Sequence, residues 1–363
     1  MRAFVTGGTG FIGKHVVRKL LARGYRVDAL ARSDASAAAV RHMGATPVRG
    51  DLNHPDTYRA ALRSSDVAFH IAGWYEVGSA DRELAEKINV EGTRHVLHTA
   101  VEVGTPRIVY VSTMAVFGDT HGVLADETYQ RPPDQPFLSL YERTKWQAHT
   151  QVAEPLIASG APLIIVLPGM VYGPGDHSLV GEFMRRYYRR QFPIFPAPEM
   201  TLTFAHVEDV AEGIILAAEK GKLGESYLLT GPAKTMHTMT RLWSRLSGTP
   251  EPLIEISGRP LKPLASLMDA LGESIRLPRV LSGEVVRMLD VSYIGRSDKA
   301  RRALGWNQRP LEEGMIQTLA WIASESPPPA PPETRRRQTA GFAIGAALGL
   351  LAVWLLGRTR RRQ

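Results

Sequence analysis

The chain begins with the β-prone run Arg2-Ala-Phe-Val-Thr6, which leads directly into the glycine-rich turn Gly7-Gly-Thr-Gly-Phe-Ile-Gly13. We expect a helix to follow, roughly from Phe11 to Ala22, so that the order is strand, glycine turn, helix. Glycine spacing alone is a weak signal, because a tight turn also serves packing. The strand in front and the helix behind favour a dinucleotide site, where the backbone approaches a pyrophosphate and the helix offers N–H groups to it.

Strand and helix signals continue to alternate beyond this turn. Apolar, β-prone segments bounded by turn residues recur, and a long helical segment separates two of them. The expected strands are Tyr25–Ala31, Pro47–Leu52, Asp66–Gly73, Arg107–Thr113 and Pro162–Leu167, and the expected helix runs from about Leu84 to Val103. This alternation predicts an α/β fold with a Rossmann-type, doubly wound parallel sheet.

The carboxyl end of the second expected strand reads Arg32-Ser33. In a dinucleotide fold this end meets the adenosine ribose, where an acidic residue would bind a free 2′-hydroxyl and arginine suits a 2′-phosphate. Asp28 lies inside the strand and not at its tip. The sequence therefore favours NADP, with NAD as the alternative; an Arg32 that is merely solvated would leave the choice open.

Tyr141 and Lys145 are four residues apart in Tyr141-Glu-Arg-Thr-Lys145. On a helix such residues share a face, with Cβ atoms roughly 5 to 6 Å apart. An ammonium group beside a phenol lowers the phenol's pKa and makes it a usable proton donor. Such a pair also arises by chance on exposed helices, so its meaning depends on the rest of the chain.

Composition limits the chemistry that the chain can perform. The 363 residues contain no cysteine, which excludes a disulfide, a thiolate nucleophile and a cysteine-based zinc site, and suggests an intracellular setting. The formal charge is +8, but seven arginines near the carboxyl terminus account for most of it: Arg335, Arg336, Arg337, Arg358, Arg360, Arg361 and Arg362. The body of the protein is near neutral, so nucleic-acid binding is not expected.

Several further motifs occur in an order that resembles the extended short-chain dehydrogenases/reductases, the NAD-dependent epimerase/dehydratase family. This superfamily includes nucleotide-sugar epimerases, dihydroflavonol reductases and 3β-hydroxysteroid dehydrogenases. The matching segments are Thr6–Gly13, Gly50–Leu52, His70–Gly73, Asn89–Thr93, Val111–Gly118, Tyr141–Lys145, Pro168–Pro174, His206–Ala211, Ser297–Trp306 and Pro310–Gly314. The resemblance covers nearly all of residues 1–323 and is strongest to the dihydroflavonol reductase-like and 3β-hydroxysteroid dehydrogenase-like branch.

The resemblance implies a catalytic role for three residues. Tyr141 would give or take a proton, Lys145 would bind the nicotinamide ribose and tune Tyr141, and Thr113 would hydrogen-bond the reacting oxygen. Ser112 is a less favoured substitute for Thr113. Asn89 either has a structural role, which we favour, or helps to position the catalytic strand. A hydride then moves between nicotinamide and a carbinol carbon, and no metal is required.

The resemblance also implies a set of cofactor contacts. Asp51 and Leu52 would meet the adenine, Ala72 and Gly73 would let the backbone pass the cofactor closely, and Pro168 to Val171 would flank the nicotinamide. The complete expected set is Gly7, Gly10, Phe11, Ile12, Gly13, Arg32, Asp51, Leu52, Ala72, Gly73, Tyr141, Lys145, Pro168 and Val171.

The carboxyl-terminal tail predicts a membrane anchor. A proline-rich spacer at 327–332 precedes 18 uncharged residues, 340–357, whose helix would rise about 27 Å, enough for a bilayer core. A buried soluble helix is the alternative. Gly341, Gly345 and Gly349 form a small-residue stripe on which a second copy could pack, so a homodimer is one expectation. The catalytic body should lie in the cytoplasm, although the arginine flanks do not settle the orientation.

Five segments follow from these observations. They are a nucleotide-binding Rossmann domain at 1–170, a mainly substrate-binding region at 171–323 with some segments returning to the Rossmann core, a linker at 324–339, a transmembrane helix at 340–357 and a basic tail at 358–363.

The sequence leaves three functions open. The favoured one is an NAD(P)-dependent reductase or dehydrogenase of a lipid-like or polycyclic small molecule, which the aromatic pair Trp74-Tyr75 and the anchor support. A nucleotide-sugar epimerase or dehydratase with retained cofactor is the second, because the four arginines within Phe183–Arg190 could grip a diphosphate. Alternatively, the same arginines could touch anionic lipid or simply form a basic helix face in water. A membrane-tethered NADP-sensing scaffold without turnover is the third.

Overall fold

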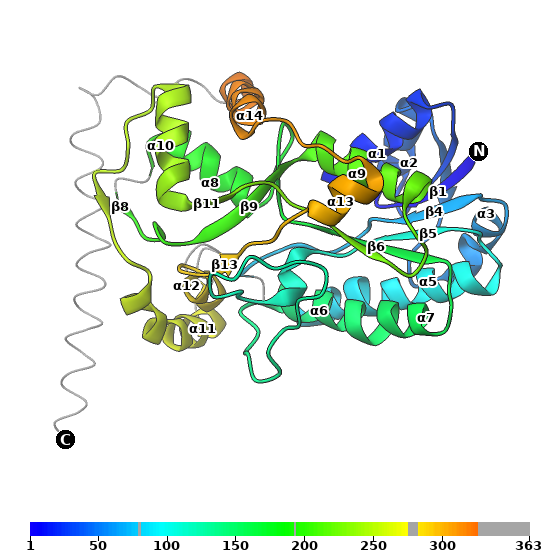
Figure 1. Ribbon diagram of the computed structural model, residues 1–363, viewed down its shortest axis with the longest axis horizontal. Coiled ribbons are helices and arrows are strands. Elements are labelled where there is room, and N and C mark those ends of the chain that lie inside the picture. Colours follow the sequence, from blue (N-terminus) through cyan, green and yellow to red (C-terminus); the bar gives the residue numbers. More distant parts are fainter. Residues whose placement is uncertain (79–80, 192–193, 275–281, 326–363) are drawn as a thin grey trace.

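The computed structural model describes residues 1–78, 81–191, 194–274 and 282–325. Figure 1 shows a large sheet with helices on both faces at one end of the molecule, and a smaller region of helices and short strands at the other. The amino terminus lies at the end of the molecule away from the smaller region, where the inner strand β1 (Arg2–Thr6) begins.

The large sheet has seven strands, all parallel. Its order is β10 (Ser226–Leu229), β6 (Leu163–Pro168), β5 (Ile108–Val111), β4 (Val67–His70), β1 (Arg2–Thr6), β2 (Arg26–Ala31) and β3 (Thr46–Arg49). The strand order reverses between β1 and β4, which is the switch point where doubly wound sheets bind ligands. The predicted α/β fold with a doubly wound parallel sheet is confirmed.

Helices cover both faces of this sheet. On one face α1 (Phe11–Ala22) packs against α9 (Val207–Lys220), with α2 (Asp34–His42) beside them and α13 (Asp298–Leu304) behind. The other face carries α3 (Arg59–Arg63), α5 (Gly92–Glu102), α6 (Leu140–Ala148) and α7 (Glu154–Ala158). Because both faces are covered, the inner strands are apolar along their whole length instead of alternating.

Two long helices contain a π-helical turn close to Tyr141 and Lys145. The expected helix from Leu84 to Val103 is built as α4 (Arg82–Glu86), the π turn η2 (Lys87–Glu91) and α5. Helix α6 likewise continues through the π turn η4 (His149–Ala153) into α7. Helix α6 packs against η2, so the first π turn lies beside the helix that carries Tyr141 and Lys145. Such π turns are frequent at functional sites.

The smaller region has a core of its own. Strand β9 (Thr201–His206) pairs with β7 (Met170–Tyr172), β11 (Ala233–Thr235) and β13 (Ser292–Tyr293), while β8 (Ile194–Phe195) pairs with β12 (Ile254–Glu255). The helices of this region and of the chain's end are α8 (Leu179–Tyr188), α10 (Met236–Ser247), α11 (Ala265–Ser274), α12 (Gly283–Arg287) and α14 (Leu311–Glu325). Trp243, Phe204 and Phe195 are fully buried here.

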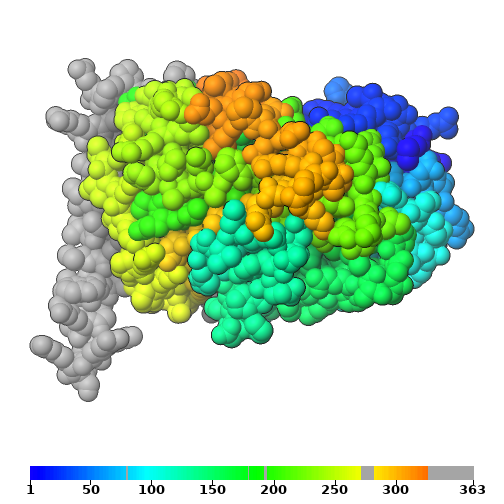
Figure 2. Space-filling view, in the orientation of Figure 1, coloured from blue at the N-terminus to red at the C-terminus, as the bar shows by residue number. Residues whose placement is uncertain are grey.

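The two regions are interleaved along the sequence. Strand β10 and helices α9 and α13 follow residue 170 but belong to the layers of the large sheet. Figure 2 shows the orange segment that contains α13 and α14 lying between the blue-to-green part of the surface and the yellow part. Helix α13 contacts α9 and β10, whereas α14 contacts α8 and α10, so this one segment holds both regions.

The membrane prediction concerns residues that the structure does not describe. Within the described ranges, none of the helices combines the length and apolar character needed to cross a membrane. The predicted transmembrane helix 340–357, the basic tail 358–363 and the spacer from residue 326 onward lie outside these ranges.

Candidate active site

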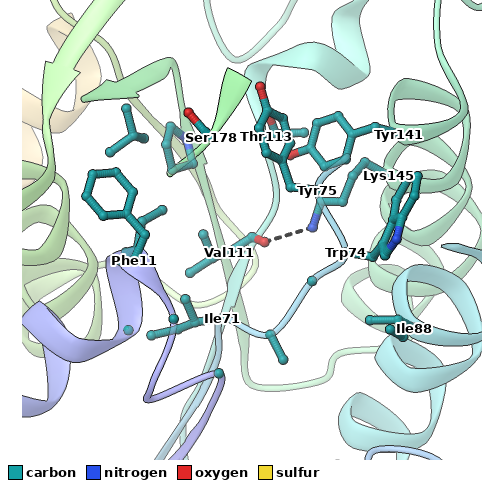
Figure 3. A pocket seen from close by; sticks show the side chains of 18 of the residues that line it. Phe11, Ile71, Trp74, Tyr75, Ile88, Val111, Thr113, Tyr141, Lys145 and Ser178 are labelled. Atoms are coloured by element: carbon teal, nitrogen blue, oxygen red, sulfur yellow. Dashed lines mark hydrogen bonds between the residues drawn. The ribbon is translucent and has the colours of Figure 1, made fainter. Parts of the chain in front are cut away.

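A cavity of about 890 Å³ opens at the carboxyl ends of the strands that flank the switch point. Both regions line it, and Figure 3 shows its inner part. All fifteen residues predicted from the sequence lie on its wall: Gly7, Gly10, Phe11, Ile12, Gly13, Arg32, Asp51, Leu52, Ala72, Gly73, Thr113, Tyr141, Lys145, Pro168 and Val171. Residues spread over 165 positions of the sequence therefore meet around one space.

The glycine turn lies against the end of strand β4. Gly7 has a φ of +72°, and a Cβ there would lie 2.6 Å from the backbone nitrogen of Ala72. A Cβ on Gly13 would collide with the carbonyl oxygen of Gly7. The turn is thus too tight for side chains at either position, which is the physical reason for glycine there.

The first turn of α1 fits an anionic group. Its N-cap residue, Gly10, supplies no capping side chain, and the first turn carries no acidic residue. The leading N–H groups of the helix consequently have no side-chain acceptor, and Phe11, Ile12 and Gly13 border the cavity. Free N–H groups at the positive end of a helix dipole are suited to the pyrophosphate of a dinucleotide.

The adenosine end of the cavity is basic and polar. Arg32 is exposed and borders the cavity together with Ser33 and Ser36, which cap α2 through each other's side chains. Asp28 is buried in β2 and pairs with Arg2 at 2.6 Å, so it cannot face a ribose. Asp51, at the neighbouring strand end, accepts a hydrogen bond of 2.9 Å from the backbone of Asn53.

The catalytic motif is held at the start of α6. Ser139 caps this helix by accepting a hydrogen bond from the backbone of Glu142, so the following turn presents Tyr141 and Lys145 to the cavity. Thr113 lies two residues after β5; its side chain accepts a hydrogen bond of 3.2 Å from the backbone of Ala115 and lies close enough to Tyr141 to lower its pKa. Figure 3 shows the three side chains gathered on one wall of the cavity, with Tyr75 beside them.

Lys145 is almost fully buried beneath this wall. Its ammonium group donates hydrogen bonds to the carbonyl oxygen of Val111 at 3.0 Å and to the Tyr110 hydroxyl at 3.1 Å. Burial lowers the pKa of Lys145, and the neighbouring Tyr141 opposes that shift. The two acceptors fix the ammonium group in place, which suits a residue that must hold one position through a reaction.

The pKa of Tyr141 differs from the sequence prediction. Burial raises this pKa above its usual value, while the charge of Lys145 and the hydrogen bond from Thr113 lower it. The direction predicted for the lysine's effect is therefore right, but the predicted net lowering is wrong. Desolvation of a phenol in a closed pocket outweighs one nearby cation, because burial disfavours the charged phenolate.

An aromatic turn lies directly against Tyr141 at the wall of the cavity. The rings of Tyr75 and Tyr141 meet edge to face, with centroids 4.7 Å apart. The side chain of Asn89 accepts from the backbone nitrogen of Trp74 at 2.7 Å and donates to its oxygen and to Thr144 on α6. Asn89 thus ties the aromatic turn to the catalytic helix, in line with the structural role assigned to it from the sequence.

Sequence reasoning missed most of the wall that the smaller region supplies. Asp176, His177, Leu202, Met288 and Tyr293 all border the cavity, although they come from separate elements without a shared motif. It also missed Tyr110, which lies two residues before Ser112. The phenol hydroxyl of Tyr110 is a polar group within the buried strand β5 and could have been noticed for that reason.

The arginine cluster within Phe183–Arg190 does not border the cavity. Arg185 and Arg186 both pair with Glu182 on their own helix, at 3.3 and 2.7 Å. Arg185 also donates to the backbone oxygen of Asp176. These contacts match the alternative interpretation of the cluster as a basic helix face.

Residues 3–229 match the model of the family described as NAD dependent epimerase/dehydratase. The chain belongs to this family. The resemblance predicted from the motifs is thereby confirmed, and this epimerase/dehydratase-family chain is a nicotinamide-dependent oxidoreductase.

Relatives of the epimerase/dehydratase-family chain cover nearly its whole described length. It is 32% identical to a 4-hydroxy-2-methyl-3-oxo-4-farnesyl-3,4-dihydroquinoline-1-oxide ketoreductase of Stigmatella aurantiaca, over 88% of this chain and 96% of that one. It is 30% identical to sterol demethylase protein B of Methylococcus capsulatus, over 89% and 98% of the two chains. The crystal structure of gox2253 superposes with a TM-score of 0.78 at 32% identity, over 89% and 98%.

Proposed function

We propose that the protein is an NADP-preferring reductase or dehydrogenase that moves a hydride between nicotinamide and a carbonyl or hydroxyl carbon of a lipid-like or polycyclic molecule. The observation that carries this proposal is the apolar, aromatic wall around Tyr141. That wall consists of Trp74, Tyr75, Val77, Leu84, Met170, Leu202, Met288 and Tyr293. A pocket of this kind binds by removing apolar surface from water.

The roles of the three catalytic residues follow from their positions. Bound nicotinamide would supply or accept the hydride. The side chain of Thr113, which lines the cavity together with Tyr141, can orient the reacting oxygen. The hydroxyl of Tyr141 then gives that oxygen a proton in reduction or takes one in oxidation. The charge of buried Lys145 stabilises the phenolate that reduction leaves behind, more strongly than it would in water.

Two relatives support the substrate class. One is named for reducing a ketone on a farnesylated quinoline oxide, and the other for sterol demethylation. Both names point to large molecules that are mainly apolar. The apolar wall defined above has the matching character, and two acidic residues that also border the cavity, Asp176 and Glu142, are almost fully buried.

The preference for NADP rests on the adenosine end of the cavity. Arg32 and two serine hydroxyls can bind a 2′-phosphate, and Asp28, which would otherwise favour a free 2′-hydroxyl, is occupied by Arg2. NAD remains the alternative cofactor, as the family's description names it.

The second candidate is a nucleotide-sugar epimerase or dehydratase with retained cofactor, which the family name favours. A sugar nucleotide brings a diphosphate that needs cationic partners. Arg185 and Arg186 are engaged by Glu182 and lie off the cavity wall, which weakens this candidate. The third function, an NADP-sensing scaffold without turnover, would not need Thr113, Tyr141 and Lys145, and all three are present.

We further propose that the tail anchors the enzyme. The 18 uncharged residues at 340–357 are long enough to span a bilayer, and a substrate dissolved in that bilayer would suit the apolar wall. The catalytic body, with a nucleotide domain at 1–170 and a substrate region at 171–323, would stand in the cytoplasm, and the glycine stripe could pair two copies. Carbonate washing of membranes from producing cells tests the anchor. The full chain should stay with the membranes, and its release into the wash would contradict the anchor.

The activity is tested with the full chain in detergent. Ketosteroids, farnesylated quinolone-type ketones and UDP-sugars are each offered with NADPH and with NADH, and Tyr141→Phe serves as the inactive control. Oxidation of NADPH that depends on an apolar ketone and is lost in the variant would support the proposal. Interconversion of UDP-sugars without net cofactor oxidation would replace it with the epimerase.

A further inference from the structure

A single carboxylate of the smaller region bonds two segments of the catalytic wall. Glu284 lies in α12, and its Oε1 accepts a hydrogen bond of 2.7 Å from the backbone N–H of Leu140. Its Oε2 accepts another of 2.7 Å from the backbone N–H of Gly78. Hydrogen bonds to an ionised acceptor are short and about twice as strong as neutral ones. One side chain thus joins three segments that are far apart in the sequence.

The bond to Leu140 lies at the start of the catalytic helix. Leu140 is the first residue of α6 and directly precedes Tyr141. The first N–H groups of a helix have no partner within it, and a negative charge beside them is favoured by the helix dipole. Ser139 satisfies one of them by accepting from Glu142, and Glu284 satisfies another from the smaller region. The placement of the first turn of α6 therefore depends on a side chain of α12.

The bond to Gly78 holds the far end of the segment 74–78, which contains the aromatic turn. The near end of this segment is held by Asn89, whose side chain bonds both backbone groups of Trp74. Between the two ends, the ring of Tyr75 meets that of Tyr141 edge to face, as Figure 3 shows. The segment is thus tied to the large-sheet region at one end and to the smaller region at the other.

Helix α12 also contributes to the substrate side of the cavity. Met288 follows α12 directly, four residues after Glu284, and borders the cavity. Residues four apart on a helix lie on the same face. Val285 of the same helix is buried in one core cluster with Val77 of the segment 74–78. A substrate that contacts Met288 therefore contacts the short helix that holds both the aromatic turn and the start of α6.

We propose that Glu284 is a positioning residue that sets the placement of Tyr141 relative to a substrate bound against Met288. The proposal rests on the catalytic roles and the substrate class proposed above. Glu284 acts through its two hydrogen bonds and does not itself border the cavity. A misplacement of about 1 Å can cost roughly a hundredfold in rate, so bonds at a distance from the reacting atoms can control turnover.

Glu284→Gln tests the proposal with little change in shape. The amide has only one acceptor oxygen, and its NH₂ group would face one of the two N–H donors. With the full chain in detergent, NADPH and an apolar ketone, we expect kcat per NADPH-binding site to fall about tenfold. The dissociation constant for NADPH should not change. Counting sites by NADPH titration removes any unfolded fraction from the comparison, so a role in stability alone would leave kcat per site unchanged.

Leu140→Pro removes one of the two bonds from its other end. Proline is tolerated at the first position of a helix, where its missing N–H breaks no bond within the helix. Ser139 is already extended, with a φ of −147° and a ψ of 160°, as the residue before a proline should be. We expect a similar loss of kcat per site, with NADPH affinity again unchanged.

The double variant Glu284→Gln, Leu140→Pro shows whether the two residues act as a unit. With proline at 140, the amide oxygen is free to accept from Gly78 and the NH₂ group meets no opposing N–H. The double variant should therefore lose no more kcat than Leu140→Pro alone, because groups that share one interaction are not additive.

Glu251→Gln is the matched control. It converts an exposed carboxylate of the smaller region, paired with Arg241 at 3.6 Å, into an amide, and it should behave as wild type. An unchanged kcat per site in Glu284→Gln, a fall in NADPH affinity as large as that in kcat, or losses that multiply in the double variant would each overturn the proposal. If Tyr141→Phe keeps full activity, the proposed function itself fails, whatever the Glu284 variants do.

Discussion

One side of the cavity is formed mainly by backbone atoms and the other mainly by side chains. The side under α1 is formed by backbone, where Gly7 and Gly13 leave no room for a Cβ and the helix end supplies bare N–H groups. The side that the smaller region supplies is formed by side chains from β7, β9 and β13 and by Met288, which follows α12. A backbone surface tolerates few changes and leaves a motif in the sequence, whereas a side-chain surface needs only the right shape and polarity.

Between these sides lies the catalytic wall, where the largest effect is expected. Tyr141→Phe keeps the ring against Tyr75 and removes only the proton donor. We expect kcat to fall by about 10²- to 10⁴-fold, the usual contribution of a positioned acid or base, with nucleotide affinity unchanged. Steady-state kinetics and nucleotide titration by protein fluorescence measure both. If nucleotide affinity fell as much as kcat, the phenol would act mainly in binding the cofactor.

Gly13→Ala tests the backbone side. The new methyl group would collide with the carbonyl oxygen of Gly7, so the turn must move. Strain of this kind costs about 1–3 kcal/mol, and we expect both nucleotide affinity and the midpoint of thermal unfolding to fall. Gly10→Ala is the matched control, because its Cβ would lie 3.2 Å from the same oxygen and should disturb less. Equal behaviour of the two variants would contradict the steric account.

Arg32→Ala tests the charge at the adenosine end. Loss of a hydrogen bond to a charged phosphate is worth about 1.5–3 kcal/mol, so kcat/KM with NADPH should fall about tenfold or more. The value with NADH should stay nearly constant. Arg41→Ala, which removes an exposed arginine of α2 away from the cavity, is the control. A parallel decline with both nucleotides would remove the argument for NADP.

Met288→Ala tests the side-chain wall. Shortening one apolar side chain should cost about 1–3 kcal/mol of transition-state binding for an apolar ketone. We expect a lower kcat/KM for that ketone and an unchanged dissociation constant for NADPH, since Met288 comes from the smaller region. If only the dissociation constant for NADPH changed, Met288 would contact the cofactor instead of the substrate.

Asp126→Asn tests the contact between the two regions and should have the smallest effect. Hydrogen bonds from Arg296 and Thr128 lower the pKa of Asp126 to about 2. The folded pKa is below the unfolded value of about 4, so the stabilisation is present above pH 4 and is lost as the pH falls toward 2. Because the pair is partly exposed, we expect at most about 1 kcal/mol at neutral pH. Urea unfolding at pH 7 and pH 3 should show a difference from wild type that shrinks at the lower pH.

Much of the cofactor side could be predicted from the sequence. The bounds expected for α1, Phe11 to Ala22, agree with the structure, because a glycine turn and an apolar periodicity are both local signals. The buried strands were also found, although their ends shift by a few residues where Pro47–Leu52 becomes Thr46–Arg49. The π turns η2 and η4 were not foreseen, since one extra residue in a helical turn leaves no distinct pattern.

The amino-acid sequence by itself determined the Rossmann sheet, the dinucleotide turn and the family. Each of these depends on glycines, strands and paired residues that are close in sequence. Only the tertiary structure decided the net pKa of Tyr141, since burial comes from segments far from α6. It also decided that Arg185 and Arg186 turn away from the cavity and that His149 lies between Ser112 and Glu154. Desolvation and contact between distant elements have no local signature, so they appear only when the chain is folded.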